Sequence, residues 1–181
     1  MVKLNSKRRI QRALFELLRE RSIDDIAVSE VVERAGVSRT SYYRAYGSLQ
    51  SVVDDALDEL FAEVESLAPR GELLSGDDET ERFERSLLEI LKLYHDNADQ
   101  LQMLLDGSAD KTFRNRLFAF TLDALPTADG QDDSALEAMK RTYMAAGTAT
   151  VICQWVGGGC VLSMEDMTAF IMQKRREALS G

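Results

Sequence analysis

A short polar segment near the N-terminus carries the side chains best suited to binding a charged partner. Hydroxyl groups and two arginines alternate along it: Ser38, Arg39, Thr40, Ser41, Tyr43 and Arg44. Ser38 can cap a new helix, because its side-chain oxygen can accept a hydrogen bond from a backbone N–H group of the first turn. The following side chains then lie on a short polar helix whose hydrogen-bonding groups suit the major groove of DNA.

The preceding residues predict the element that positions this helix. Four apolar residues recur at helical spacing: Val28, Val31, Val32 and Ala35. Gly36 can adopt the left-handed conformation that ends a helix, and Val37 supplies the apolar contact after it. Two short helices joined at Gly36 form a helix-turn-helix.

The segment from Lys7 to about Leu60 resembles the N-terminal domain of the TetR-type transcriptional regulators. The resemblance lies in a first amphipathic helix, the turn at residues 35–38, Tyr43 and Tyr46, and Ser48 at the start of a fourth helix. The sequence departs from the family pattern at three positions: Ala27 replaces a frequent capping Thr, Ala45 a polar residue, and Leu49 a frequent phosphate-binding Lys.

The resemblance implies a set of DNA contacts. Base edges are expected to be read by Arg39, Thr40, Ser41 and Arg44. The residues expected to cap the helix or to position phosphates are Ser38, Tyr43, Ser48, Lys7 and Arg8. The basic residues of the first helix, including Arg12, have an alternative role, in which they only form a solvated helix face and contact no phosphate. Packing is the expected role of Tyr46, which occupies an aromatic core position of the family pattern.

The net charge of −9 disfavours DNA binding at first sight, but the charge is unevenly distributed. Residues 1–50 hold 10 Lys and Arg against 6 Asp and Glu, a net charge of +4, whereas residues 51–181 hold 12 against 25, a net charge of −13. A basic head can approach phosphates while an acidic body stays in solvent.

The remaining pattern predicts an all-α fold. Only two prolines occur, and no alternating strand pattern stands between turn signals. About nine helices are expected. We expect a DNA-binding domain at residues 1–50, a connecting helix at 51–67, a linker at 68–79, and an effector-binding and dimerisation domain at 80–181. Capping boxes at Ser134 and Ser163 predict the last two helices, at about 138–156 and 167–178.

The sequence contains no signal peptide, so a cytoplasmic location is expected. Residues 142–164 are uncharged, but the glycines at 157–159 interrupt them, and a buried helix is favoured over a membrane span. Cys153 and Cys160 are expected to be reduced core residues. No metal or cofactor is expected, because His95 is the only histidine and lies more than fifty residues from either cysteine.

The C-terminal body offers two further sets of residues. Aromatic and Met side chains that could line an apolar effector cavity, with ordinary core packing as the alternative, are Tyr94, Met103, Phe113, Phe120, Tyr143 and Trp155. Small and apolar residues expected at a dimer interface, by resemblance to the final helices of the family, are Ala146, Gly147, Thr150, Met167 and Ile171.

No catalytic motif occurs: the sequence lacks a Gly-rich phosphate loop, a GxSxG elbow and HExxH, so no enzymatic activity is expected.

The resemblance to the TetR-type regulators implies a homodimeric repressor that binds a pseudo-palindromic operator and leaves it when a small apolar effector binds. The alternative is a DNA-bound interaction module whose body binds a partner protein. Residues 143–156, the three glycines that follow them and the final Met-rich helix give the body a second, weaker resemblance. It is to the C-terminal domain of a TetR subgroup common in Firmicutes.

Overall fold

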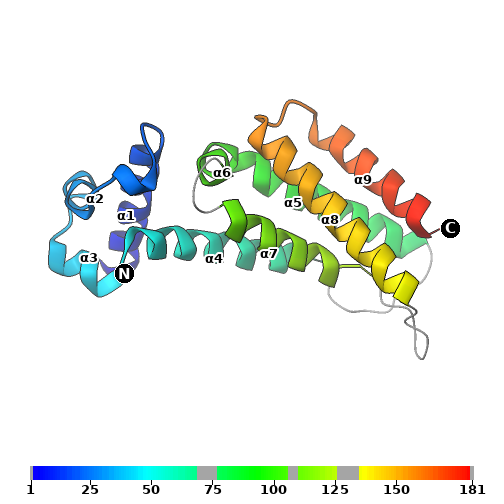
Figure 1. The fold of residues 1–181 in the computed structure, drawn as a ribbon, viewed down its shortest axis with the longest axis horizontal. Helices are drawn as coiled ribbons and strands as arrows, with labels where there is room; N and C mark the ends of the chain where they lie inside the picture. Colours follow the sequence, from blue (N-terminus) through cyan, green and yellow to red (C-terminus); the bar gives the residue numbers. More distant parts are fainter. Residues whose placement is uncertain (1, 69–76, 106–109, 126–134, 180–181) are drawn as a thin grey trace.

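The structure is a computed structural model that describes residues 2–68, 77–105, 110–125 and 135–179. Within these ranges the chain forms nine α-helices, one 3₁₀ turn and no strand, so the all-α prediction is confirmed for the described residues. The helices divide into a small head and a larger body, joined by one long helix (Figure 1).

The head contains α1 (Val2–Leu18), the 3₁₀ turn η1 (Ile23–Asp25), α2 (Val28–Ala35) and α3 (Arg39–Ala45). Its core is formed by fully buried side chains of these helices and of the helix that follows them, including Ile10, Leu14, Val31, Tyr42 and Val52. Ile10, Ala13, Leu14 and Leu17 form the inner face of α1, which is therefore amphipathic as expected.

Helix α4 (Leu49–Leu67) belongs to both parts of the molecule. Its N-terminus is closed by a reciprocal capping box, in which the N–H of Ser51 donates to Ser48 Oγ and the N–H of Ser48 donates to Ser51 Oγ, each at 3.1 Å. Val52 and Val53 are buried near the head, whereas Phe61 packs at 5.7 Å, between ring centres, against Phe113 of the body. A shift of this helix would therefore move the head relative to the body.

The body contains α5 (Asp77–Asp96), α6 (Ala98–Leu105), α7 (Asp110–Asp123), α8 (Ala135–Gly157) and α9 (Met164–Leu179). Helix α8 packs on α6 and α7, and α9 packs on α5 and α8. Helix α9 begins at the expected cap, where the N–H of Asp166 donates to Ser163 Oγ at 3.0 Å. The other expected cap, Ser134, lies outside the described residues.

Several boundaries differ from the sequence-based expectations. Most of the expected linker at 68–79 lies outside the described residues, but residues 77–79 already belong to α5. Helices α8 and α9 both extend beyond the predicted 138–156 and 167–178. Among the described helices, none is both long and apolar enough to cross a membrane.

Candidate nucleic-acid interface

Helix α3 presents its polar side chains to solvent. Arg39, Thr40 and Arg44 are exposed, and Tyr43 keeps 60% of its surface accessible. On its opposite side, Tyr42 is fully buried and its ring meets that of Tyr43 edge to face, with the ring centres 5.3 Å apart. Burial of one tyrosine therefore orients the exposed face of the helix.

The turn that precedes α3 has the geometry that the sequence predicts. Gly36 adopts φ 59° and ψ 41°, and the N–H of Val37 donates to the carbonyl of Val32 at 3.2 Å, which closes the end of α2. Ser38 Oγ accepts a hydrogen bond from the N–H of Ser41 at 3.1 Å. Ser38 is thus the helix cap. Its hydroxyl also donates a hydrogen bond to Oγ of the half-buried Ser41 at 2.9 Å.

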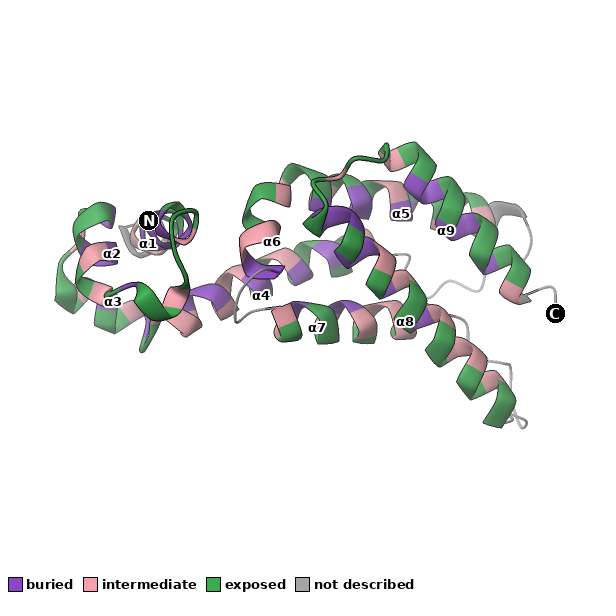
Figure 2. Ribbon diagram, turned by 45° about the horizontal axis from the view of Figure 1, so that its top comes forward, coloured by how far each residue is buried: buried purple, intermediate pink, exposed green. Residues whose placement is uncertain are grey.

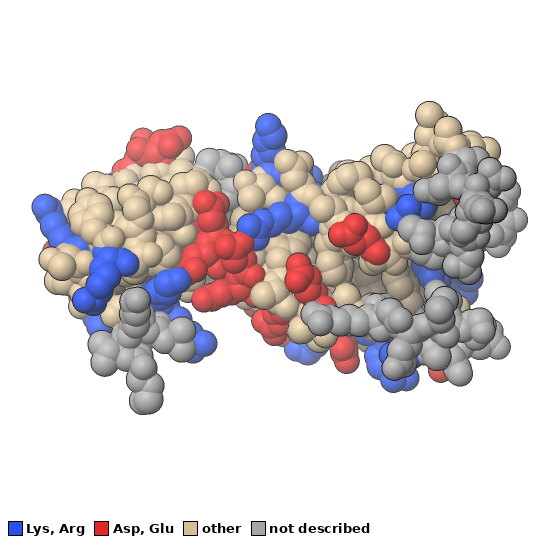
Figure 3. All heavy atoms as spheres, turned by 90° about the horizontal axis from the view of Figure 1, so that it is seen from below, with Lys and Arg blue, Asp and Glu red and all other residues tan. Residues whose placement is uncertain are grey.

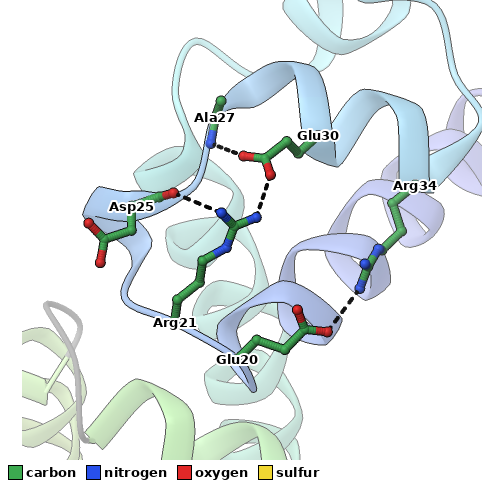
Figure 4. Close-up of polar contacts among 6 residues, drawn as sticks. All are labelled: Glu20, Arg21, Asp25, Ala27, Glu30 and Arg34. Atoms are coloured by element: carbon green, nitrogen blue, oxygen red, sulfur yellow. Dashed lines mark hydrogen bonds and ion pairs between the residues drawn. The ribbon is translucent and has the colours of Figure 1, made fainter.

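Ionic contacts hold α2 in place despite the missing capping side chain at Ala27. The N–H of Ala27 donates to Glu30 at 2.8 Å, and Glu30 also pairs with Arg21, which donates to the carbonyl of Asp25 at 3.3 Å (Figure 4). The hydrogen bond from Arg21, followed by that from Ala27, lowers the pKa of Glu30. One half of a capping box is therefore present, supported by a cation from the preceding loop.

Asp55 of α4 connects the helices of the head. Its carboxylate accepts hydrogen bonds from Lys7 Nζ at 2.7 Å, from Tyr46 Oη at 2.7 Å and from Gln11 Nε2 at 3.2 Å. Burial alone would raise the pKa of Asp55, but the bonds from Lys7 and Tyr46 outweigh it and lower that pKa below its ordinary value. Tyr46 is buried, as the sequence predicts, and directly follows α3, so Asp55 fixes the end of the polar helix.

Lys7, one of the residues expected to position a phosphate, forms its contacts within the head in this structure. Its ammonium group is paired with Asp55 and lies 5.3 Å from the centre of the Tyr46 ring, so it joins α1 to α4. Arg8 is exposed, as expected of a phosphate contact, and Ser48 is exposed while it caps α4. Arg9, which the sequence did not single out, donates to the carbonyl of Gly36 at 2.7 Å. Contacts between residues so far apart along the chain leave no local sequence signal.

The surface charge follows the division of the molecule. On the face shown in Figure 3, several Lys and Arg side chains lie on the head, and acidic side chains gather where the head meets the body. Helix α4 contributes acidic residues at this junction, among them Asp58, Glu59 and Glu63, all exposed. The head is therefore the part of the described surface best suited to polyanions.

The body contains a mostly apolar cavity between α5, α7, α8 and α9. Of the residues predicted to line such a cavity, Tyr94 and Phe120 do so. The other four are elsewhere: Phe113 is fully buried against Tyr94, Met103 is half-buried on α6, Trp155 donates to the carbonyl of Leu162, and Tyr143 is 78% exposed. Arg175 also lines the cavity, although the sequence analysis did not single it out. Its helical spacing from the buried Thr168, Ile171 and Met172 could have indicated that it lies on the inner face of α9.

The residues predicted for a dimer interface fall on two different surfaces. Ala146, Gly147 and Thr150 lie on an exposed face of α8, together with Leu136, Met139 and Tyr143 (Figure 2). Met167 and Ile171 are instead buried inside the chain, at 3% and 4% exposure, because α9 turns this face toward α5 and α8. They cannot contact a partner without unpacking α9.

The described residues contain no cluster of His, Cys, Asp and Glu that could hold a metal ion. Cys153 and Cys160 are free thiols, and burial raises the pKa of each. Neither is therefore prepared to act as a thiolate nucleophile.

The sequence matches no protein-family model and no curated protein. Solved structures do match it over most of its length. A TetR transcriptional regulator from Streptococcus agalactiae 2603V shares 20% identity over 95% of this chain and 94% of that chain, with a TM-score of 0.62. The dihydroxyacetone kinase operon activator DhaS shares 16% identity over 97% of this chain and 94% of that chain, with a TM-score of 0.64.

A TetR-family transcriptional regulator from Streptomyces coelicolor shares 14% identity over 96% of this chain and 82% of that chain, with a TM-score of 0.64. At such low identity the likeness concerns the fold, and it covers the head and the body together. With its helix-turn-helix head, its connecting helix α4 and its helical body, the chain has the fold of the TetR transcriptional regulators.

Proposed function

We propose that the protein is a DNA-binding transcriptional regulator that reads its operator with α3. The observation that carries this proposal is the exposed polar face of α3, with Arg39, Thr40 and Arg44 in solvent, held by the buried Tyr42 and Tyr46. Arginine can form two parallel hydrogen bonds to a guanine edge, and each such pair contributes about 1–3 kcal/mol of discrimination between bases. Arg8 and the capped start of α4 at Ser48 position phosphates.

The regulator acts as a homodimer in this proposal, with the exposed face of α8 as the contact. Leu136, Met139 and Tyr143 are 61%, 69% and 78% exposed and lie on one side of the helix, and Gly147 continues that side. Exposed apolar residues grouped in this way favour burial against a second surface. A two-fold dimer would place the two copies of α3 at half-sites about one DNA turn, ~34–36 Å, apart.

Ligand-responsive repression is the regulatory mechanism that we propose. The apolar cavity of the body, lined by Tyr94 and Phe120 among others, would receive a small effector that favours a conformation with a different separation of the heads. The exposed ion pair of Arg19 with Asp99, at 3.3 Å, also joins head to body, but exposed pairs contribute only ~0–1 kcal/mol. Helix α4, whose buried side chains belong to both parts, is therefore the main route of coupling.

A second candidate is a DNA-bound module whose body binds a partner protein and that activates transcription. Two observations favour it: one structural neighbour is named an operon activator, and the exposed face of α8 could receive another protein. Operator release by a small molecule, with purified protein alone, separates the two candidates.

Selection from a library of randomised DNA duplexes tests the DNA-binding proposal. Purified protein is expected to enrich a pseudo-palindromic sequence with half-sites about 10 base pairs apart, or modestly more. Binding to the enriched duplex should exceed binding to a scrambled duplex of the same composition by ~10³-fold or more at physiological salt. Equal affinity for both duplexes would reject the proposal.

A further inference from the structure

The turn between α2 and α3 is held by a side chain of the first helix. Arg9 lies on α1, and its guanidinium group donates a hydrogen bond at 2.7 Å to the carbonyl of Gly36, 27 positions away in the sequence. In the part of the chain that the structure describes, no carboxylate pairs with Arg9. Arg12, one turn further along α1, pairs instead with Glu16 of the same helix. The two arginines therefore differ in what they hold, although both are exposed.

Gly36 makes room for this contact. A Cβ atom at this position would lie 2.6 Å from Nη2 of Arg9, so the guanidinium group occupies the space that a side chain of residue 36 would fill. Gly36 also has a φ of 59°, in the left-handed region that favours glycine. The absence of a side chain at residue 36 thus serves both the backbone conformation and the approach of Arg9.

The carbonyl that accepts this hydrogen bond stands at the end of α2. The N–H groups of Gly36 and Val37 close the last turn of that helix by donating to the carbonyls of Glu33 and Val32. The carbonyl of Gly36 itself comes after them and is satisfied by Arg9. Carbonyl groups at the end of a helix carry partial negative charge, so a cation beside them is favourable.

The peptide group that Arg9 holds leads directly into the helix proposed to read DNA. Two residues separate Gly36 from Arg39, the first residue of α3. Rotation of the backbone at Gly36 would swing α3 as a whole, and glycine resists such rotation least. The hydrogen bond from Arg9 limits this rotation before α3 begins, as the bond of Tyr46 to Asp55 does directly after α3 ends.

We propose that Arg9 is a positioning residue for sequence reading: by holding the carbonyl of Gly36, it fixes the angle at which α3 leaves the turn. The inference rests on the proposed function, because it concerns the fit of α3 to the bases. Hydrogen bonds to base edges depend on direction, whereas attraction to phosphates is largely independent of sequence. Loss of the Arg9 contact therefore weakens discrimination between DNA sequences more than it weakens binding to DNA in general.

The variant Arg9→Met tests this role, and Arg12→Met is its matched control. Each substitution removes one exposed cation from α1 and keeps a long unbranched side chain, but only Arg9→Met removes a contact with the turn. Titration by fluorescence anisotropy measures the affinity of each variant for the duplex selected by the unaltered protein and for a scrambled duplex. The ratio of the two affinities should fall ~3–10-fold in Arg9→Met, the equivalent of one hydrogen bond, and stay unchanged in Arg12→Met.

This ratio separates positioning from folding and from charge. A smaller folded fraction, or the loss of a phosphate contact, weakens binding to both duplexes by about the same factor and leaves the ratio unchanged. An unchanged ratio in Arg9→Met, or an equal fall in Arg12→Met, would overturn the proposal.

Amide hydrogen exchange without DNA tests the hold on the turn itself. The N–H of Val37 donates to the carbonyl of Val32 at 3.2 Å, and exchange requires this bond to open. In Arg9→Met this amide should exchange ~3–10-fold faster than in the unaltered protein, because the turn has lost one hydrogen bond. The amide of Leu14, in the buried face of α1, should exchange equally in both proteins. An unchanged rate at Val37 would contradict the assignment.

The proposed function and this inference fail in different ways. If the unaltered protein prefers no duplex over a scrambled one, the proposed function is rejected, and the inference with it. If the unaltered protein prefers its selected duplex and Arg9→Met keeps that preference in full, the inference alone is overturned and the proposed function stands.

Discussion

The ammonium group of Lys7 lies 2.7 Å from the carboxylate of Asp55, and this pair joins the first helix of the head to the helix that enters the body. Tyr46 donates to the other carboxylate oxygen, so the same acid fixes the residue that ends α3. The position of α3 is thus coupled to α4 through one partly buried side chain.

Asp55→Asn should lower the free energy of unfolding by about 1–3 kcal/mol at neutral pH, because it weakens charged hydrogen bonds from Lys7 and Tyr46. The folded protein lowers the pKa of Asp55, so the stabilisation is present above its unfolded pKa of about 3.9 and is lost as the pH falls through the lower folded value. The difference between variant and unaltered protein should therefore shrink below about pH 4, as measured by urea unfolding at several pH values.

Glu63→Gln is the matched control, since it removes an exposed carboxylate from the same helix and should change stability by less than about 0.5 kcal/mol. An equal loss in both variants would mean that Asp55 acts only through the net charge of α4.

Gly36→Ala should destabilise the head by about 1–2 kcal/mol. Gly36 has a φ of 59°, and a Cβ atom there would lie 2.6 Å from Nη2 of Arg9, which donates to the Gly36 carbonyl. Gly47→Ala is the control, because a Cβ atom at Gly47 would meet no other atom within 4 Å and its φ is not positive. Thermal unfolding of both variants measures the difference, and an equal shift in melting temperature would exclude strain at Gly36.

Ala27→Ser should stabilise the head by about 0.5–2 kcal/mol, because a hydroxyl there can accept a hydrogen bond from the first turn of α2. Ala27 already has the extended backbone of a cap residue, with φ −88° and ψ 142°. Ala62→Ser, at an exposed position inside α4, should be neutral or mildly destabilising. If neither variant is more stable than the unaltered protein in thermal unfolding, the contacts of Glu30 with Ala27 and Arg21 already stabilise the start of α2 fully.

Gly147→Leu should weaken dimerisation without lowering the stability of the single chain. Gly147 is exposed and a Cβ atom there would meet nothing within 4 Å, so any clash must come from another molecule. Sedimentation of the variant should show monomer at micromolar concentrations where the unaltered protein is dimeric. Ala119→Leu, on the exposed surface of α7, is the control and should leave the dimer intact.

The sequence predicted the parts of the fold that depend on neighbouring residues. Gly36, Ser38 and Ser163 each act within a few residues, and their conformations follow from local chemistry. The pairing of Lys7 with Asp55 joins residues 48 positions apart, so nothing near Lys7 distinguishes an ion pair from a phosphate contact.

The surfaces of the body were harder to predict, because α8 and α9 carry apolar residues on more than one face. Periodicity identified both helices, but it could not decide that Tyr143 faces solvent while Met167 and Ile171 face α5 and α8. Which apolar face a helix buries in its own chain depends on the packing of all its neighbours.

The central claim is that α3 reads DNA sequence, and the most direct test is the affinity of Arg44→Ala for the duplex selected by the unaltered protein. Lys111→Ala is the control, because it removes one exposed cation from the body. Titration by fluorescence anisotropy should show that Arg44→Ala binds this duplex more weakly by about 1–3 kcal/mol, with helical content and dimerisation unchanged. Lys111→Ala should bind it as the unaltered protein does. Unchanged affinity in Arg44→Ala, or equal losses in both variants, would contradict the account.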